Sequence, residues 1–166
     1  MSGVSIDLFD QLTPALQRAI DAVGDLSAPM NKISGEWYVA TLDRFRQQVD
    51  PLGVPWKPRS DGTTGSLLFK SGDMVDAIRP DHGETFAEVG VEATGGPEEY
   101  ARIHNEGGVV RPKTGKALRT PFGAFAQIVI PKRQFIGASE SDKANAVEIL
   151  TDHLKAAFNG DAGGEP

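Results

Sequence analysis

Apolar residues recur every three or four positions in three parts of the chain, and this spacing predicts three helices. The three parts are residues 5–24, 27–50 and 139–160. We expect one apolar stripe of each helix to be buried, because an amphipathic helix turns such a stripe toward the core. The stripes are Leu8, Leu12, Leu16, Ala19 and Val23 in the first helix, Tyr38, Leu42, Phe45 and Val49 in the second, and Val147, Leu150, Leu154 and Phe158 in the third.

Residues near the ends of these segments indicate where the helices start and stop. Thr13 followed by proline is typical of an N-cap and a first helical position, so the first helix starts or kinks there. Ser27 can start the second helix, which should end at Asp50 because the proline after it disfavours a helical conformation. Ser139 or Ser141 can cap the third helix.

The pattern changes in the middle of the chain, where it indicates strands and one short helix. ETFAEVGVE, residues 84–92, alternates well enough for a strand. GGPEEYARIHNEGG, residues 95–108, predicts a short helix that ends at its glycines and has Tyr100, Ile103 and His104 on its inner face. VVRPKTGKALRTPFGAFAQIVI, residues 109–130, predicts a long hairpin, because proline and glycine divide its short apolar runs.

Together these elements predict an α+β fold. We expect two N-terminal helices, an antiparallel sheet with a long hairpin and a short inserted helix, and a C-terminal helix packed on the sheet. The length of 166 residues fits a single domain, placed at residues 1–158 and followed by a disordered tail at residues 159–166. The 19 glycines and 11 prolines predict many turns and extended connections.

Charge and composition narrow the classes of function. A formal net charge of −6 argues against a protein whose whole surface binds nucleic acid or an anionic membrane, since both need a broad positive field. The absence of cysteine excludes disulfides, thiol nucleophiles and zinc sites built on cysteine. No apolar run approaches the length of a membrane span, so we expect a soluble cytoplasmic product with no membrane partner.

Motifs for catalysis and cofactor binding are missing from the sequence. The chain has no GxSxG, and KTGKAL lacks the first glycine of a Walker A motif, whose place Val110 takes. His104 and Glu106 in HNE imitate half of a zinc deaminase motif, but the cysteine half is absent. We therefore expect His104 to be held by hydrogen bonds on a packed helix face, and no catalytic residue, metal or cofactor. A metal-dependent enzyme built on His104 and Glu106 stays as an alternative.

Four basic residues lie close together in the predicted hairpin, namely Arg111, Lys113, Lys116 and Arg119. One interpretation is a solvated loop tip, because no aromatic residues lie between them to stack on bases. The other is an arm that docks on an acidic neighbouring subunit, which a chain with 23 acidic and 17 basic residues would supply. In that case the hairpin should be mobile in the free subunit and ordered in the assembly.

The segment DPLGVPWKP, residues 50–58, places three prolines around a tryptophan. The prolines lower the entropy that is lost when the segment becomes ordered. Trp56 can then anchor a subunit interface, or it can cover the second helix as part of the subunit's own core. The composition of the segment does not separate these two roles.

Four segments resemble the phage virion morphogenesis family, also called tail completion proteins, of contractile-tailed and Mu-like phages. In order, they are RFRQQVDPLGVPWKP (44–58), LLFKSGDMVDAI (67–78), VGVEATGGPEEYARIHNEGG (89–108) and IPKRQFIG (130–137). Lys132, Ile136 and Asn105 depart from the alanine, leucine and glutamine that the family pattern has there. The matching positions are Gly72, Met74, Ile78, Val89, Gly90, Tyr100, Ala101, His104, Gly107, Gly108, Pro131, Arg133, Phe135 and Gly137.

The resemblance implies a virion structural protein that completes or terminates the tail at the neck and enables head–tail joining. It implies a homo-oligomeric ring, expected to be a hexamer, whose partners are the tail tube protein and the head–tail connector proteins. DNA would pass through the lumen without specific binding, and the protein would occupy the host cytoplasm during assembly. A nucleic-acid-binding packaging or head maturation factor that uses residues 111–119 stays as an alternative. The expected interface or motif residues are Trp56, Tyr100, His104, Arg111, Lys113, Lys116, Arg119, Pro131, Arg133, Phe135 and Gly137.

Overall fold

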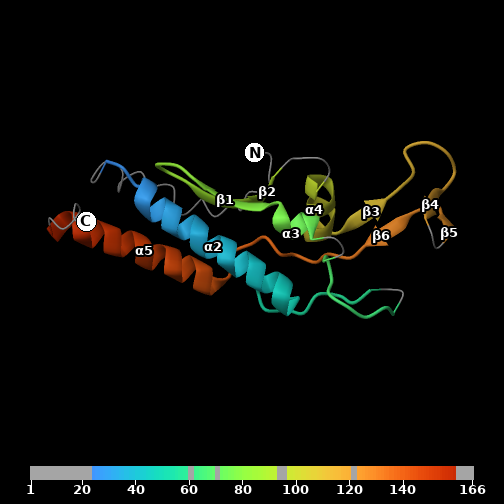
Figure 1. Ribbon diagram of the computed structural model, residues 1–166, viewed down its shortest axis with the longest axis horizontal. Helices are drawn as coiled ribbons and strands as arrows, with labels where there is room; N and C mark the ends of the chain where they lie inside the picture. Colours follow the sequence, from blue (N-terminus) through green and yellow to red (C-terminus); the bar gives the residue numbers. More distant parts are fainter. Residues whose placement is uncertain (1–23, 60–61, 70–71, 93–96, 121–122, 160–166) are drawn as a thin grey trace.

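The computed structural model describes residues 24–59, 62–69, 72–92, 97–120 and 123–159 (Figure 1). The predicted first helix and the predicted disordered tail fall almost entirely outside these residues. No helix in the described part of the chain is long and apolar enough to cross a membrane.

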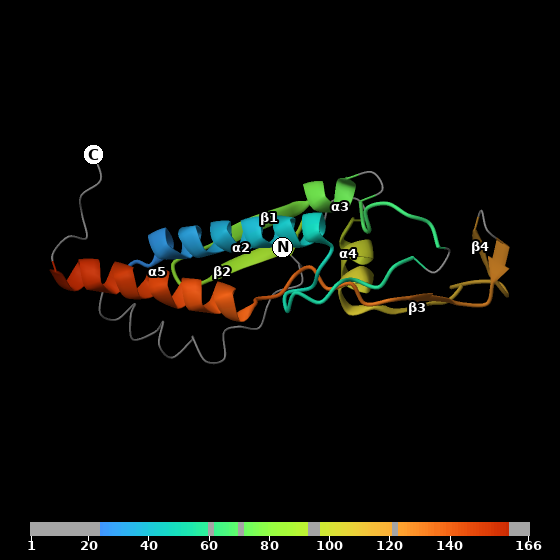
Figure 2. The same ribbon diagram turned by 90° about the horizontal axis from the view of Figure 1, so that it is seen from below.

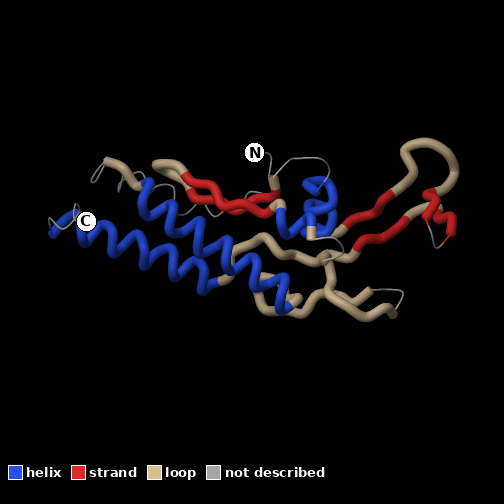
Figure 3. The backbone as a smooth tube through the Cα atoms, viewed as in Figure 1, coloured by secondary structure: helices blue, strands red, loops and turns tan. Residues whose placement is uncertain are grey.

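The described residues combine helices with short antiparallel strand pairs, which confirms the predicted α+β class. The helices are α2 (Ser27–Gln47), α3 (Asp73–Asp76), α4 (Pro97–Glu106) and α5 (Glu140–Asn159). The strand pairs are β1 (Ile78–His82) with β2 (Ala87–Val91), β3 (Gly108–Val110) with β6 (Ile128–Ile130), and β4 (Leu118–Thr120) with β5 (Gly123–Phe125). Instead of one sheet, these strands form three two-stranded sheets (Figure 3).

Helix α2 lies at the centre of the fold, with α5 along one side and the β1–β2 sheet along another (Figures 1 and 2). The prediction that the C-terminal helix packs on the sheet was therefore wrong. Its buried residues, Ala146, Ile149 and Leu150, belong to the same core cluster as Met30, Ile33 and Trp37 of α2. Because α2 is apolar on more than one side, it can contact the sheet and α5 at once.

Helix α2 starts at Ser27, as predicted, but ends earlier than expected. The carboxylate of Asp25 accepts hydrogen bonds from the Ser27 backbone N–H at 2.8 Å and the Ser27 hydroxyl at 2.6 Å, which satisfies a free donor of the first turn. At the other end Gln48 adopts a left-handed conformation with φ of 56°, so the helix stops at Gln47 rather than at Asp50. Val49 leaves the helix and pairs with Pro55 across a tight turn.

The buried face of α2 is also rotated from the predicted stripe. Of the four predicted residues only Phe45 is buried, whereas Tyr38 and Leu42 lie half-buried at its border. Two polar side chains, Thr41 and Arg44, lie on the observed buried face, where the predicted stripe had no residue. A pattern of apolar residues alone cannot locate a face that contains buried polar groups.

Helix α5 begins with the predicted serine cap. The Ser139 hydroxyl accepts a hydrogen bond from the Asp142 backbone N–H at 3.1 Å, and the Asp142 carboxylate accepts one from the Ser139 backbone N–H at 2.7 Å. This reciprocal pair is a capping box. Leu150 is buried as predicted and Leu154 half-buried, but Val147 is 51% exposed, which corrects the predicted stripe. The Phe158 side chain lies outside the described part.

Strand β2 and helix α4 were both predicted, whereas strand β1 was not. β1 contains Pro80, which cannot donate to a ladder and hides the strand in the sequence IRPDH. Helix α4 ends at Glu106, and the φ of 75° at the next residue, Gly107, favours glycine. Its Tyr100 is 67% exposed, so the predicted inner position was wrong, and the buried positions are Ala101 and Asn105.

Candidate assembly surface

Residues 131–137 lie between β6 and α5 and are held by three other parts of the chain, namely α2, the proline-rich turn and the end of α4. We call them the connecting segment. It carries the last of the four family-like sequence segments, and its partners lie in the first and third of them. Contacts of the connecting segment with these partners bring the three family-like segments together in space.

Arg133 ties the connecting segment to α4 and to the proline-rich turn. Its backbone N–H donates to the His104 carbonyl at 2.7 Å. Its guanidinium donates from Nε to the Lys57 carbonyl at 2.8 Å and from Nη2 to the Pro58 carbonyl at 3.1 Å. The side chain is 7% exposed and makes no ion pair with a described carboxylate, so carbonyl oxygens solvate its charge.

Asn105 of α4 holds the next two residues of the segment. Its buried side-chain oxygen accepts the backbone N–H groups of Phe135 and Ile136, each at 3.0 Å. A single amide side chain therefore satisfies two donors that would otherwise be buried without a partner. The departure from glutamine at this position does not prevent Asn105 from binding the segment.

Arg44 of α2 fixes the end of the segment and the start of α5. Its Nη1 donates to the carbonyls of Phe135 at 3.3 Å and Gly137 at 2.6 Å. Its Nη2 forms an ion pair with the carboxylate of Asp142, which is the same group that caps α5. Three elements thus meet at one guanidinium, whose planar donors suit such a multiple contact.

Trp56 lies in the core of the subunit, with 6% of its surface exposed. Its indole N–H donates to the Gln134 carbonyl at 2.9 Å, and its ring meets Phe45 edge-on with centroids 5.4 Å apart. Phe45 in turn contacts Phe135 with centroids 4.8 Å apart. The core role that the sequence left open for Trp56 is the one that this geometry supports. Leu52 and Val54 of the same turn are large hydrophobic residues that are exposed.

Glycine allows two close approaches along the connecting segment. A Cβ on Gly137 would lie 2.6 Å from the ring of Pro51, and one on Gly107 would lie 2.8 Å from the Lys132 backbone nitrogen. Both distances are shorter than real Cβ contacts. We call the region where the connecting segment contacts α2, α4 and the proline-rich turn the junction. Pro131 lies half-buried just after β6, so the segment enters the junction directly from the hairpin.

His104 does not hold its expected hydrogen bonds. Its Nδ1 is buried without a partner among the described residues. Burial, and secondarily the charge of Arg133, lower the pKa of His104 below its ordinary value of 6.5. Glu106 is exposed, and the described residues contain no group of three side chains placed to hold a metal ion.

The hairpin that enters the junction extends away from the rest of the molecule (Figures 1 and 2). We call residues 108–130 the arm. None of its described side chains is buried, and the directly opposed pair Val109 and Val129 is 44% and 66% exposed. An isolated two-stranded ribbon is marginally stable in water. The sequence predicted the long hairpin, whereas only the structure shows that the hairpin lacks core contacts.

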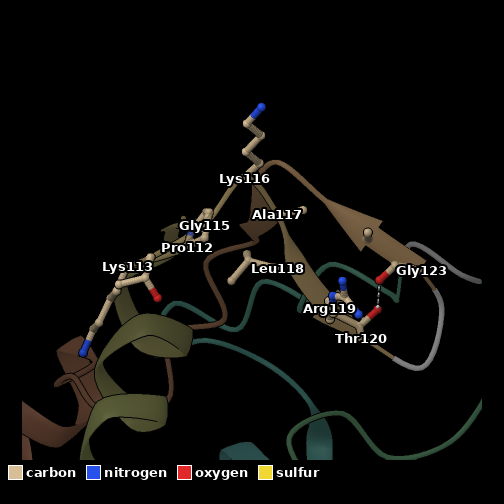
Figure 4. A pocket seen from close by; sticks show the side chains of 11 residues that line it. Pro112, Lys113, Gly115, Lys116, Ala117, Leu118, Arg119, Thr120 and Gly123 are labelled. Atoms are coloured by element: carbon tan, nitrogen blue, oxygen red, sulfur yellow. Dashed lines mark hydrogen bonds between the residues drawn. The ribbon is translucent and has the colours of Figure 1, made fainter.

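The tip of the arm presents the basic residues (Figure 4). It borders an open hollow of about 790 Å³, lined mainly by residues 112–120. Lys113 and Lys116 point away from this hollow, as the close view shows. Arg111, Lys113, Lys116 and Arg119 are all exposed, and none forms an ion pair with another described residue.

The polar residues that organise the junction were largely missed in the sequence. The spacing of Ser139 and Asp142 fits a capping box and could have identified Asp142. Arg44 and Asn105 gave no such signal, because their partners lie 91–98 and 30–31 residues away. The predicted motif residues Arg133, Phe135 and Gly137 do come together here, whereas Tyr100 is exposed.

Comparison with known proteins identifies the group to which this fold belongs. No solved structure matches the chain significantly. The chain is 25% identical over 157 residues to the protein named "Putative capsid assembly protein G" of Escherichia phage Mu, a match that covers 86% of this chain and 90% of that protein. The sequence model of the phage virion morphogenesis family matches residues 7–155. That match includes the junction and the whole arm, and the chain is a phage virion assembly protein that belongs to the phage virion morphogenesis family.

Proposed function

We propose that this protein completes the phage tail at the neck and enables the joining of heads to tails. In this role it forms a homo-oligomeric ring of six subunits at the head-proximal end of the tail. The ring contacts the tail tube protein on one side and the head–tail connector proteins on the other. Its function is structural and requires no catalytic side chain.

The observation that carries this proposal is an arm without core contacts on a rigidly held base. The base is fixed by Asn105 of α4 and Arg44 of α2, which bind the connecting segment, and by Arg133 of the segment itself, which binds the proline-rich turn. The arm itself has no buried side chain among its described residues. A segment of this kind gains its stabilising contacts from a neighbour, and a fixed base limits the entropy lost when the neighbour binds.

The charge of the chain suits a protein that surrounds a DNA passage. A net charge of −6 repels a duplex rather than retaining it. DNA would then pass through the lumen without specific binding. Together with family membership, this charge supports a position at the neck.

The location can be tested by immunogold electron microscopy of purified virions. We expect label at the head–tail junction in intact particles and at one end of isolated tails. Label confined to the baseplate, or its absence from the particles, would falsify the neck proposal.

The role in joining can be tested with the double variant Lys113→Glu, Lys116→Glu. We expect normally folded protein and tails that fail to join heads, because the arm would no longer bind its partner. The matched control is Lys32→Glu, Lys155→Glu, which makes the same change of charge on exposed residues of α2 and α5. Normal infectivity of the arm variant, or equal loss in the control, would contradict a role of the arm in joining.

A further inference from the structure

We propose that the arm of one subunit docks on the outer face of the β1–β2 sheet of a second copy of this chain. The proposal rests on the proposed function, because a ring requires a contact of this kind, and it names the two surfaces that meet. It follows from the distribution of charge, the register of β1 and β2, and the positions of both surfaces in the molecule.

Basic and acidic residues are unevenly distributed along the chain. Residues 107–139 contain six of the 17 basic residues and none of the 23 acidic residues. The rest of the chain therefore has 11 basic and 23 acidic residues, a formal charge of −12. Four of the six cations lie on the arm and have no ion-pair partner among the described residues. The complementary charge is present in abundance on the body of a second copy.

The outer face of the β1–β2 sheet is the surface that receives the arm. Ile78, Val89 and Val91 on one face of the β1–β2 sheet are buried against α2. On the opposite face, the register places Asp81 directly across from Glu88. Two like charges in directly opposed positions destabilise a strand pair. Neither carboxylate forms an ion pair with a described residue, so a cation bound across this face would relieve their repulsion.

The arm and the β1–β2 sheet lie in different parts of the molecule. The arm extends from one end of the long axis, whereas the β1–β2 sheet runs along the body toward the other end (Figures 1 and 2). A subunit's own arm does not lie on its own sheet in either view. Each copy can therefore donate an arm and receive one at the same time, which is the heterologous contact from which rings are built.

Apolar side chains favour a protein partner over DNA. Val109 and Val129 form an exposed cross-strand pair on the arm, and Phe86 at the β1–β2 turn is 37% exposed. Burying such groups contributes to a protein interface, whereas contacts to phosphates come from cations and hydrogen-bond donors. A duplex that approached the arm would also meet the field of a body with a charge of −12.

The contact can be tested by cross-linking, because the natural chain contains no cysteine. Full-length Thr114→Cys, at the arm tip, is mixed with full-length Thr85→Cys, at the β1–β2 turn, and treated with a short bismaleimide. Both positions are exposed and neither substitution changes the charge. We expect a cross-link between residues 114 and 85 of different copies, identified by mass spectrometry of the peptides.

The control replaces Thr85→Cys by Val147→Cys, an exposed position on α5. We expect the control pair to cross-link about tenfold less, because residue 147 lies on α5, outside the proposed contact. Equal yields for the two pairs, or no cross-link between residues 114 and 85, would overturn the proposal.

Charge reversal separates this contact from other uses of the arm. Adding Lys113→Glu, Lys116→Glu to the arm-labelled chain should lower the yield about tenfold, and adding Asp81→Lys, Glu88→Lys to its partner should restore it. The neutral variant Lys113→Gln, Lys116→Gln serves if the reversed chain unfolds, and it should also lower the yield. Failure of the paired reversal to restore cross-linking would overturn the proposed contact.

Duplex DNA distinguishes the remaining possibility. If the wild-type arm binds a short duplex, the arm variant does not, and paired reversal restores no cross-link, the arm is a nucleic-acid element and the proposal is wrong. The location of the protein in the virion is tested independently of this contact. Subunits that cross-link as expected but label the baseplate would refute the proposed function and leave the contact intact.

Discussion

The side-chain oxygen of Asn105 accepts two buried backbone N–H groups, so its loss should be costly. Replacing Asn105 by alanine leaves the amides of Phe135 and Ile136 without a partner. We expect the free energy of unfolding to fall by about 2 to 4 kcal/mol, measured by urea denaturation. The matched control is Arg102→Ala on the exposed side of the same helix, which should change stability by less than about 0.5 kcal/mol. Equal effects of the two substitutions would show that the junction does not depend on Asn105.

His104 should make the stability of the fold depend on pH. Its folded pKa lies below the ordinary value of 6.5, because burial and Arg133 disfavour the charged form. As pH falls below that value, the unfolded chain binds a proton that the folded chain does not, so stability decreases until the folded pKa is passed. The stability that His104 contributes is therefore fully present when the pH lies above the pKa that His104 has in the unfolded chain.

The measurement is the unfolding free energy of His104→Gln and wild type between about pH 5 and pH 7. We expect the variant to lose the part of the slope that His104 causes. His82→Gln, which removes an exposed histidine, is the matched control for the substitution itself. Parallel curves for wild type and His104→Gln would contradict this assignment.

At the scale of elements, one buried guanidinium joins α2 to α5, and a nearby exposed one provides its control. Arg44 and Arg46 both form ion pairs, but the Arg44 pair is mostly buried and also binds two carbonyls. Arg44→Met should lower the unfolding free energy by about 3 kcal/mol or more, because it leaves a partly buried carboxylate and carbonyl oxygens without their donor. Arg46→Met should cost less than about 1 kcal/mol, as exposed pairs contribute little. Similar losses in chemical denaturation would mean that the junction does not couple the two helices.

Elements whose ends carry local signals could be predicted from the sequence. Helix α4 has proline at its start and a left-handed glycine after its end, and both are readable without knowledge of the fold. The long hairpin was predicted for the same reason. Strand β1 was missed because Pro80 hides it, and its pairing depends on β2 and on α2.

Contacts between distant parts of the chain could not be predicted in this way. Arg44 looks like a surface charge in the sequence, yet it is buried because carbonyls of the connecting segment surround it. Trp56 had two possible roles, and only the position of Gln134 and Phe45 distinguished them. Such roles depend on the tertiary structure rather than on local preference.

At the scale of the whole molecule, two hairpins of similar kind have different surroundings. The β1–β2 hairpin is packed on α2, and Ile78, Ala87, Val89 and Val91 are buried. The arm has no buried side chain among its described residues. Since amide exchange is slowed by stable packing as well as by hydrogen bonds, the two hairpins should differ in their local stability.

This difference can be measured by hydrogen exchange, with the β1–β2 hairpin as an internal reference. In the free subunit we expect amides of β3 and β6 to exchange much faster than those of β1 and β2, because opening the arm exposes no buried apolar surface. In assembled tails the arm should become protected, since a neighbouring subunit then covers Val109, Val129 and the basic tip. The arm variant Lys113→Glu, Lys116→Glu should gain no protection when it is mixed with the same tails. Slow exchange of the arm in the free subunit, or the same rate before and after assembly, would show that it is stable without a neighbour.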